Sequence, residues 1–278
     1  MNNAVKVYTF LVIAFIFLCS ISGMLPAPFN LIIEIAAYAV PVFVGYLASR
    51  KFKREREEMA GLAESESTLI GLAPSKLSGI APLVMPTLGI IFLVSYLTSL
   101  LLGLLGVQGS TVENAPLFEM IILHALVPSV LEEMLFRYLP MKLIMPYSKR
   151  FCVCLSSVYF ALAHMNLYQL PYALLAGAIF ILIDVWADSI LPSFILHLLN
   201  NVVSVLWIKY SSSSEFSMWF IIILSSLAVL SLIPLVVKRR EYIRAVADAV
   251  DKGETLTDRY APMLFIVFAS LMTLLNHR

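Results

Sequence analysis

Charged residues are scarce in this chain. Asp, Glu, Lys and Arg make up 13% of the 278 residues, 60% of the residues are hydrophobic, and the formal net charge is +1. A soluble globular domain carries about twice that share of charged residues. The composition therefore excludes an ordinary soluble protein and predicts an integral membrane protein. The small net charge also gives no reason to expect a nucleic-acid partner.

Cysteine and glycine are also few. Three cysteines, Cys19, Cys152 and Cys154, are too few for a disulfide framework, and one C-x-C pair without a second cluster is a weak metal signal. We expect all three to be small buried apolar residues. The H-E-x-x-H zinc signature is absent. With only 11 glycines, the chain also lacks the glycine-broken helices that are typical of many transporters.

Long apolar runs are what the chain has instead. A helix that crosses a bilayer needs about 20 mostly apolar residues, and its backbone groups must be paired within the segment. Candidate runs lie at residues 7–25, 29–48, 82–105, 117–140, 151–165, 171–187, 190–208, 216–237 and 262–276. The sequence thus predicts an all-α polytopic membrane helix bundle of about eight or nine transmembrane helices. Residues 1–278 are expected to form a single membrane domain, with the first run retained as an anchor.

Basic residues predict which side of the membrane each loop occupies, because Lys and Arg in short loops stay on the cytoplasmic side. The stretch RKFKREREE after the second run, the loop with Lys142, Lys149 and Arg150, and the segment KRREYIR all fall on one side if the spans alternate. We therefore predict a multi-pass protein of the cell membrane with a cytoplasmic N-terminus. Segments 50–80 and 238–261 are expected to be surface helices.

A few ionisable and polar residues lie inside the apolar runs, where such residues are functional by default. Glu133 and Arg137 are four residues apart, which places acid and base on one helix face and predicts a structural ion pair. Glu132 is rotated by about 100° from Glu133, so its carboxylate is expected to face a cavity. His197 and Asn201 are also four apart, which places two hydrogen-bond donors on one face.

These residue types suit the hydrolysis of an amide. A carboxylate and an imidazole that share a water, here Glu132 and His164, can deprotonate it for attack on a carbonyl. His197 and Asn201 would then donate hydrogen bonds to the oxygen that becomes negative. Asn200 is a second candidate for the role of Asn201.

Three short motifs carry a resemblance to a known family. EEMLFR, FALAH and HLLNN, in that order on successive predicted helices, resemble the EExxxR, FxxxH and HxxxN motifs of the CPBP family of intramembrane proteases. This family includes the type II CAAX prenyl endopeptidases and bacteriocin-processing and self-immunity proteins. The resemblance covers about residues 115–208, which we expect to be the catalytic core. It implies the roles given above for Glu132, His164, His197 and Asn201, and a supporting role for Glu133 and Arg137.

The resemblance leaves metal dependence and substrate choice open. Members of the family are often named metalloproteases, but a glutamate-type mechanism without metal is also held for them. We favour no cofactor; Zn²⁺, if bound, would be held by Glu132, Glu133, His164 and His197. Family members commonly have Gly after the motif Arg, whereas this chain has Tyr138, whose bulk is expected to narrow the cleft.

Two other classes of function are compatible with the sequence. In an ion- or proton-coupled transporter, Glu132, Asp184 and the histidines would form a relay. A catalytically inactive scaffold or immunity protein of the same fold is the other class. Asp184 and Asp188 are otherwise expected to be solvated residues at a helix end. For a protease, the partner would be a membrane-associated peptide or protein within the lipid bilayer, either prenylated or bearing a leader.

Overall fold

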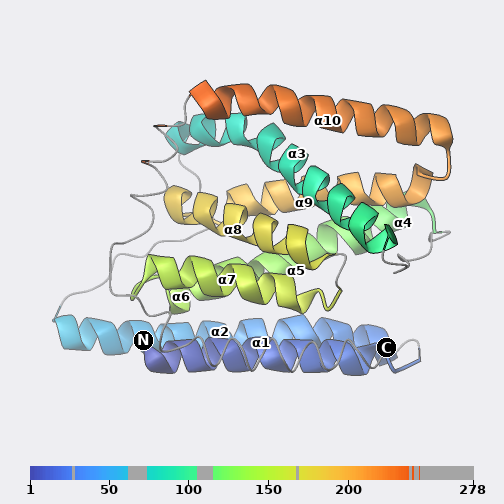
Figure 1. Ribbon diagram of the computed structural model, residues 1–278. Helices are drawn as coiled ribbons and strands as arrows, with labels where there is room; N and C mark the ends of the chain where they lie inside the picture. Colours follow the sequence, from blue (N-terminus) through green and yellow to red (C-terminus); the bar gives the residue numbers. More distant parts are fainter. Residues whose placement is uncertain are drawn as a thin grey trace.

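The computed structural model describes residues 1–26, 29–61, 74–104, 115–166 and 169–237, together with positions 240 and 244. Every regular element within these residues is a helix, so the predicted all-α class is confirmed. The helices lie in layers, with α1 and α2 on one side of the bundle and α10 on the other (Figure 1). Their bounds are α1 Asn2–Ser22, α2 Phe29–Ala60, α3 Pro74–Leu104, α4 Leu117–Ile121, η1 Ile122–Leu126, α5 Val127–Glu133, η2 Met134–Tyr138, α6 Leu139–Leu143, α7 Lys149–Ala163, α8 Leu170–Ala187, α9 Leu191–Tyr210 and α10 Ser214–Val237.

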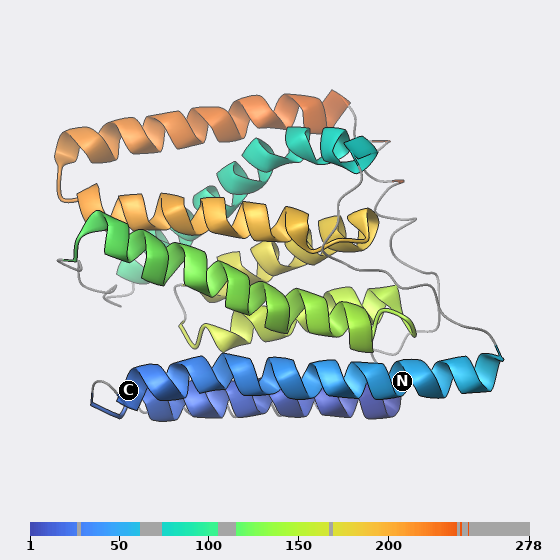
Figure 2. The ribbon, with the colours of Figure 1, turned by 180° about the vertical axis from the view of Figure 1, so that it is seen from behind.

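Helices α1 and α2 form an antiparallel pair that lies side by side in both ribbon views (Figures 1 and 2). α2 continues to Ala60, well beyond the end of its apolar run. Lys, Arg and Glu are good helix formers, and the extension has salt bridges from Lys51 to Glu55 at 3.9 Å and from Lys53 to Glu57 at 3.7 Å. The first part of the predicted surface segment 50–80 is therefore a continuation of α2.

The segment with the first motif is a helical run in which π-helical turns interrupt the α-helix twice. The two π segments, η1 and η2, each directly precede an α segment with proline in its first turn, Pro128 in α5 and Pro140 in α6. Proline lacks the N–H that would close an α-turn to the carbonyl four residues earlier. For Pro140 that carbonyl belongs to Phe136, and it accepts a hydrogen bond from Ser156 Oγ of α7. A hydrogen bond thus links the π-helical segment η2 to α7.

Helices α7 and α8 approach closely at Gly177. A Cβ atom at this position would lie 3.1 Å from Phe160 Cδ1, 3.1 Å from Ser157 Cα and 3.2 Å from the Ser157 carbonyl oxygen. Small residues allow such close backbone approach between membrane helices. The contact fixes α8 against the part of α7 that carries Phe160.

Five helices in the described residues are long and apolar enough to cross a membrane. They are Asn2–Ser22, Ile32–Ala60, Leu83–Leu104, Leu170–Ala187 and Leu191–Tyr210, and Ser214–Leu227 is a shorter apolar helix. They agree with the runs predicted at 7–25, 29–48, 82–105, 171–187 and 190–208. The chain is therefore a multi-pass membrane protein.

The remaining predicted spans have different outcomes. Run 117–140 is divided by the π turns, and run 151–165 forms α7, a helix of only 15 residues. Run 216–237 corresponds to α10. Run 262–276 lies outside the described residues, as does nearly all of segment 238–261. The total of eight or nine spans stays a prediction.

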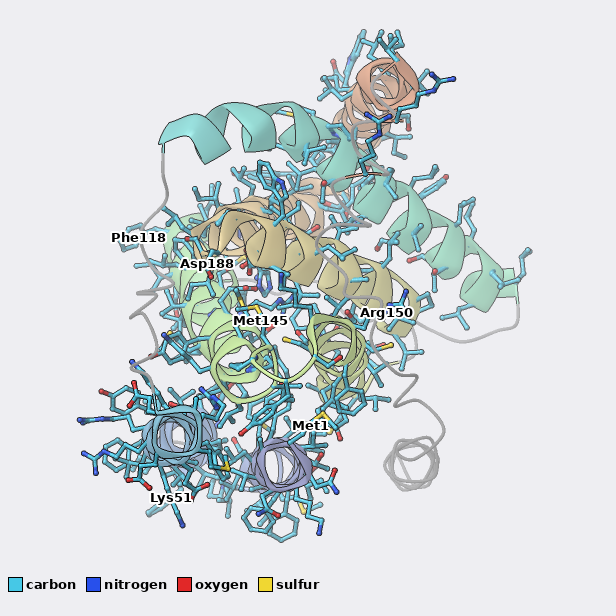
Figure 3. All side chains as sticks on the ribbon, turned by 90° about the vertical axis from the view of Figure 1, so that its left-hand side faces the viewer. Met1, Lys51, Phe118, Met145, Arg150 and Asp188 are labelled. Carbon is cyan, nitrogen blue, oxygen red and sulfur yellow. The ribbon has the colours of Figure 1, made fainter. Side chains whose placement is uncertain are left out.

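Most of the basic stretches used to predict sidedness lie at one end of the bundle. The start of α1, the end of α2 and the connection between α6 and α7 all lie at the left of Figure 1, the end that faces the viewer in Figure 3 with labels on Met1, Lys51 and Arg150. If successive spans cross the membrane in opposite directions, these basic stretches must all lie on the same side. Among the cysteines, Cys152 is buried as expected, Cys19 is half-buried, and the expectation is wrong for Cys154, which is exposed.

We expect Gly177→Val to destabilise the protein by about 1–3 kcal/mol, because the new side chain must push against the backbone of Ser157. Gly103→Val on α3 is the matched control, since no atom lies within 4 Å of a Cβ at that glycine. Thermal unfolding of both variants in detergent, followed by circular dichroism, measures the difference. Equal unfolding temperatures for the two variants would contradict the close contact between α7 and α8.

Candidate active site

Two polar stripes face each other between the first-motif segment and α9. Each repeats every fourth residue, and we call the six residues together the polar ladder: Ser129, Glu133 and Arg137 on one segment, and Ser193, His197 and Asn201 on the other. The contacts run in opposite directions along the two segments. Asn201 Nδ2 donates to Ser129 Oγ at 3.3 Å, His197 Nδ1 lies 2.7 Å from Glu133 Oε1, and Ser193 Oγ donates to Glu133 Oε2 at 2.5 Å. The first and third motifs therefore meet side by side.

Glu133 is the centre of the polar ladder. Glu133 is 1% exposed, and a carboxylate so deeply buried needs hydrogen-bonded or charged partners. His197 and Ser193 each contact one of its oxygens, and Arg137 Nε lies 3.5 Å from Oε2. The predicted ion pair with Arg137 is thus present, but the sequence did not indicate the contacts from α9.

Arg137 is fully buried and is held mainly by aromatic rings. Its guanidinium carbon lies 4.2 Å from the centroid of the Phe160 ring and 5.6 Å from that of Phe180. None of the three guanidinium nitrogens of Arg137 makes a hydrogen bond to the described part of the chain. A cation over an aromatic face is attracted more strongly when both are desolvated. These contacts, with the charge of Glu133, compensate the buried cation.

His197 connects the two adjacent carboxylates. Its Nδ1 contacts Glu133, and its Nε2 lies 3.6 Å from Glu132 Oε2, which is too long for a hydrogen bond. The Glu132 side chain is 16% exposed and is the more accessible of the two acids. Its other oxygen, Oε1, accepts a hydrogen bond from the hydroxyl of Tyr38 on α2 at 3.4 Å. Glu132 thus lies at the edge of the polar ladder, next to its histidine.

His164 lies at the C-terminal end of α7, directly after Ala163. Its Nδ1 is 2.8 Å from the carbonyl oxygen of Phe160, which identifies Nδ1 as the donor and leaves Nε2 as the other ring nitrogen. The Phe160 ring packs edge-to-face against both His164 and His197, with centroid distances of 4.8 and 5.5 Å. The second and third motifs are therefore joined through one phenyl ring.

The structure also brings in residues that the sequence did not single out. Ser193 holds Glu133, and its backbone N–H donates to Asp184 Oδ1 at 3.1 Å. Asp184 is fully buried, so its interpretation as a solvated helix-end residue is wrong. Ser193 lies four residues before His197, as Asn201 lies four residues after it. The sequence spacing alone could therefore have placed Ser193 on the same helix face. Tyr38 gave no such signal, because it lies 94 positions from Glu132.

The carboxamide residues after His197 are arranged differently from each other. Asn201 donates to Ser129, whereas Asn200 Nδ2 lies 3.5 Å from Asn201 Oδ1. Asn201 is thus the one that contacts the facing segment.

The side chains expected to hold a metal, if one binds, come from three different helical segments. Among the described residues, no group of three or more His, Cys, Asp or Glu side chains is placed so that it could hold a metal ion. The set of Glu132, Glu133, His164 and His197 as ligands of a bound Zn²⁺ stays a prediction.

Comparisons with known proteins give one match. No curated protein and no solved structure matches the chain. Residues 114–203 match the family model described as type II CAAX prenyl endopeptidase Rce1-like, and these residues contain all three motifs and the polar ladder. The match covers less than half of the chain, and over this segment it supports the resemblance to the CAAX protease family.

Proposed function

We propose that the chain is an intramembrane endopeptidase that hydrolyses a peptide bond of a membrane-associated peptide. The family match supports the protease class. The observation that carries the proposal is the position of the accessible Glu132 carboxylate beside His197, at 3.6 Å between Oε2 and Nε2. An acid, an imidazole and an amide from the first and third motifs are thus available on adjacent turns of facing helices.

In the proposed reaction, Glu132 is the general base. A water about 2.8 Å from each of two atoms can bond to both when those atoms are 3.6 Å apart, so the separation of Oε2 and Nε2 suits a single bridging water in this proposal. Glu132 takes a proton from this water while the water oxygen attacks the scissile carbonyl, and His164 helps to hold the water. The C–N bond then breaks as Glu132 returns the proton to the leaving nitrogen.

His197 and Asn201 are proposed to stabilise the oxyanion. Glu133 occupies the Nδ1 side of His197, so Nε2 is the nitrogen that faces the reacting groups, and it donates when the ring carries both protons. The Asn201 carboxamide has two N–H groups, of which one donates to Ser129 and the other is directed to the oxyanion in this proposal. Glu133 and Arg137 act by holding His197 in place.

We propose a peptide with a prenylated C-terminus as the first substrate class to test, because the matching family is described by that activity. A peptide with a leader sequence is the alternative. The cleavage site would open toward the cytoplasm, with the N-terminus of the chain on the same side of the cell membrane. The basic stretches at one end of the bundle support this orientation.

We expect Glu132→Gln to lower the rate of peptide cleavage about 10²- to 10⁴-fold, because the amide cannot accept the proton from water. Glu119→Gln, at an exposed acid on α4 of the same helical run, is the control and should retain full activity. The assay is cleavage of a prenylated peptide by purified protein, with the cut site read by mass spectrometry. Mass spectra of membrane peptides from cells that express either form would identify natural substrates.

Activity that survives Glu132→Gln would exclude Glu132 as the base. Proton-coupled solute uptake into liposomes that depends on Glu132 would instead favour the transporter class.

Cleavage is expected to persist after the purified protein is dialysed against a strong chelator, because the proposed chemistry uses a carboxylate base and hydrogen-bond donors. Elemental analysis of the dialysed sample checks that metal has been removed. Inhibition that only added Zn²⁺ reverses would contradict the metal-free mechanism.

A further inference from the structure

The Glu132 carboxylate is contacted from outside the segment that matches the family. Tyr38, on α2, donates its hydroxyl hydrogen to Oε1 at 3.4 Å, while Oε2 lies 3.6 Å from His197 Nε2. The matched segment begins at residue 114, so Tyr38 is contributed by a part of the chain that the family model does not cover. The carboxylate is thus flanked by α2 on one side and α9 on the other.

Packing holds Tyr38 in this position. The centroid of its ring lies 4.6 Å from that of Phe15 on α1, and Phe15 in turn packs edge-to-face on Phe136 of η2 with a centroid distance of 5.8 Å. Aromatic pairs of this kind restrict ring orientation and contribute beyond simple area burial. The tyrosine ring is therefore fixed relative to η2, the turn that directly follows the two acids.

A close approach of α2 to α6 reinforces this placement. A Cβ atom at Gly45 would lie 2.6 Å from Leu139 Cδ1 and 2.8 Å from Leu139 Cδ2. Any other residue at position 45 would require the end of the Leu139 side chain to move. α2 is thus seated on the first-motif segment two turns beyond Tyr38.

The contact has a chemical consequence for a general base. A carboxylate is connected to its chain by a soft torsion, so an acid with one free side samples several orientations. The hydroxyl of Tyr38 occupies one oxygen and leaves the other, Oε2, directed toward the His197 side. Tyr38 thereby holds Oε1, and Oε2 remains on the side of His197.

We propose that Tyr38 is a positioning residue that orients Glu132 for catalysis, so that the α1–α2 pair completes a site whose other residues come from the family segment. This inference rests on the proposed protease function. Tyr38 does not contact the reacting atoms in this proposal; it acts through Glu132.

The first test measures the kinetics of Tyr38→Phe in the full-length protein. Loss of this hydrogen bond should lower kcat about 3- to 10-fold, while KM for the prenylated peptide stays within about a factor of two of the wild-type value because substrate contacts are retained. Tyr46→Phe is the matched control, since Tyr46 lies on the same helix, packs near Arg50 and has an exposed ring. A kcat for Tyr38→Phe equal to that of Tyr46→Phe, or a change in KM alone, would overturn the proposal.

The second test does not require activity. Unfolding temperatures are compared for Tyr38→Phe, Glu132→Met and the double variant, because methionine removes the acceptor without leaving a cavity. If the two side chains interact, the double variant should lose less than the sum of the single losses. Additive losses would overturn the contact. A wild-type protein that cleaves no peptide would refute the proposed function, and this cycle would still decide whether Tyr38 holds Glu132.

Discussion

The structure depends on compensating a carboxylate and a guanidinium that are buried among membrane helices. Glu133 and Arg137 are almost wholly inaccessible, and breaking such a pair leaves an uncompensated charge in a medium of low dielectric. The protein meets this requirement with a histidine and a serine from α9 and with two aromatic rings from α7 and α8. The same contacts orient His197 toward Glu132, so the interaction that stabilises the helix bundle also shapes the candidate active site.

Phe160 connects all three motifs although it has no polar group. Its ring lies against Arg137 of the first motif, His164 of its own motif and His197 of the third. Gly177 allows α8 to press on this ring from behind. An apolar side chain therefore sets the relative positions of the ionisable ones. Its place in the FxxxH motif is explained by packing, since the ring fills the space between two imidazoles and a guanidinium.

The apolar runs predicted the helical class, most of the long helices and their alternation, because hydrocarbon imposes length and internal hydrogen bonding on every span. Spacing by four residues also predicted the contact between Glu133 and Arg137. It did not predict the partners of either residue on other helices, since periodicity within one helix carries no information about which helix faces it. The fully buried Asp184 illustrates this limit: from the sequence it marks a helix end, and only the fold shows that it accepts the N–H of Ser193. The π turns were missed because they depend on how prolines are accommodated.

The antiparallel order of the polar ladder has a consequence for how two helices stay aligned in depth. Apolar helix surfaces in lipid have little preference among sliding positions, because lipid tails are as apolar as the side chains. A shift of α9 by one turn, about 5.4 Å, would move His197 away from Glu133 and bring Asn201 or Ser193 to the wrong level. Each hydrogen bond of the polar ladder therefore opposes sliding of α9 along its axis. The depth of His197 below the membrane surface is set by its pairing with α5 and not by the length of α9.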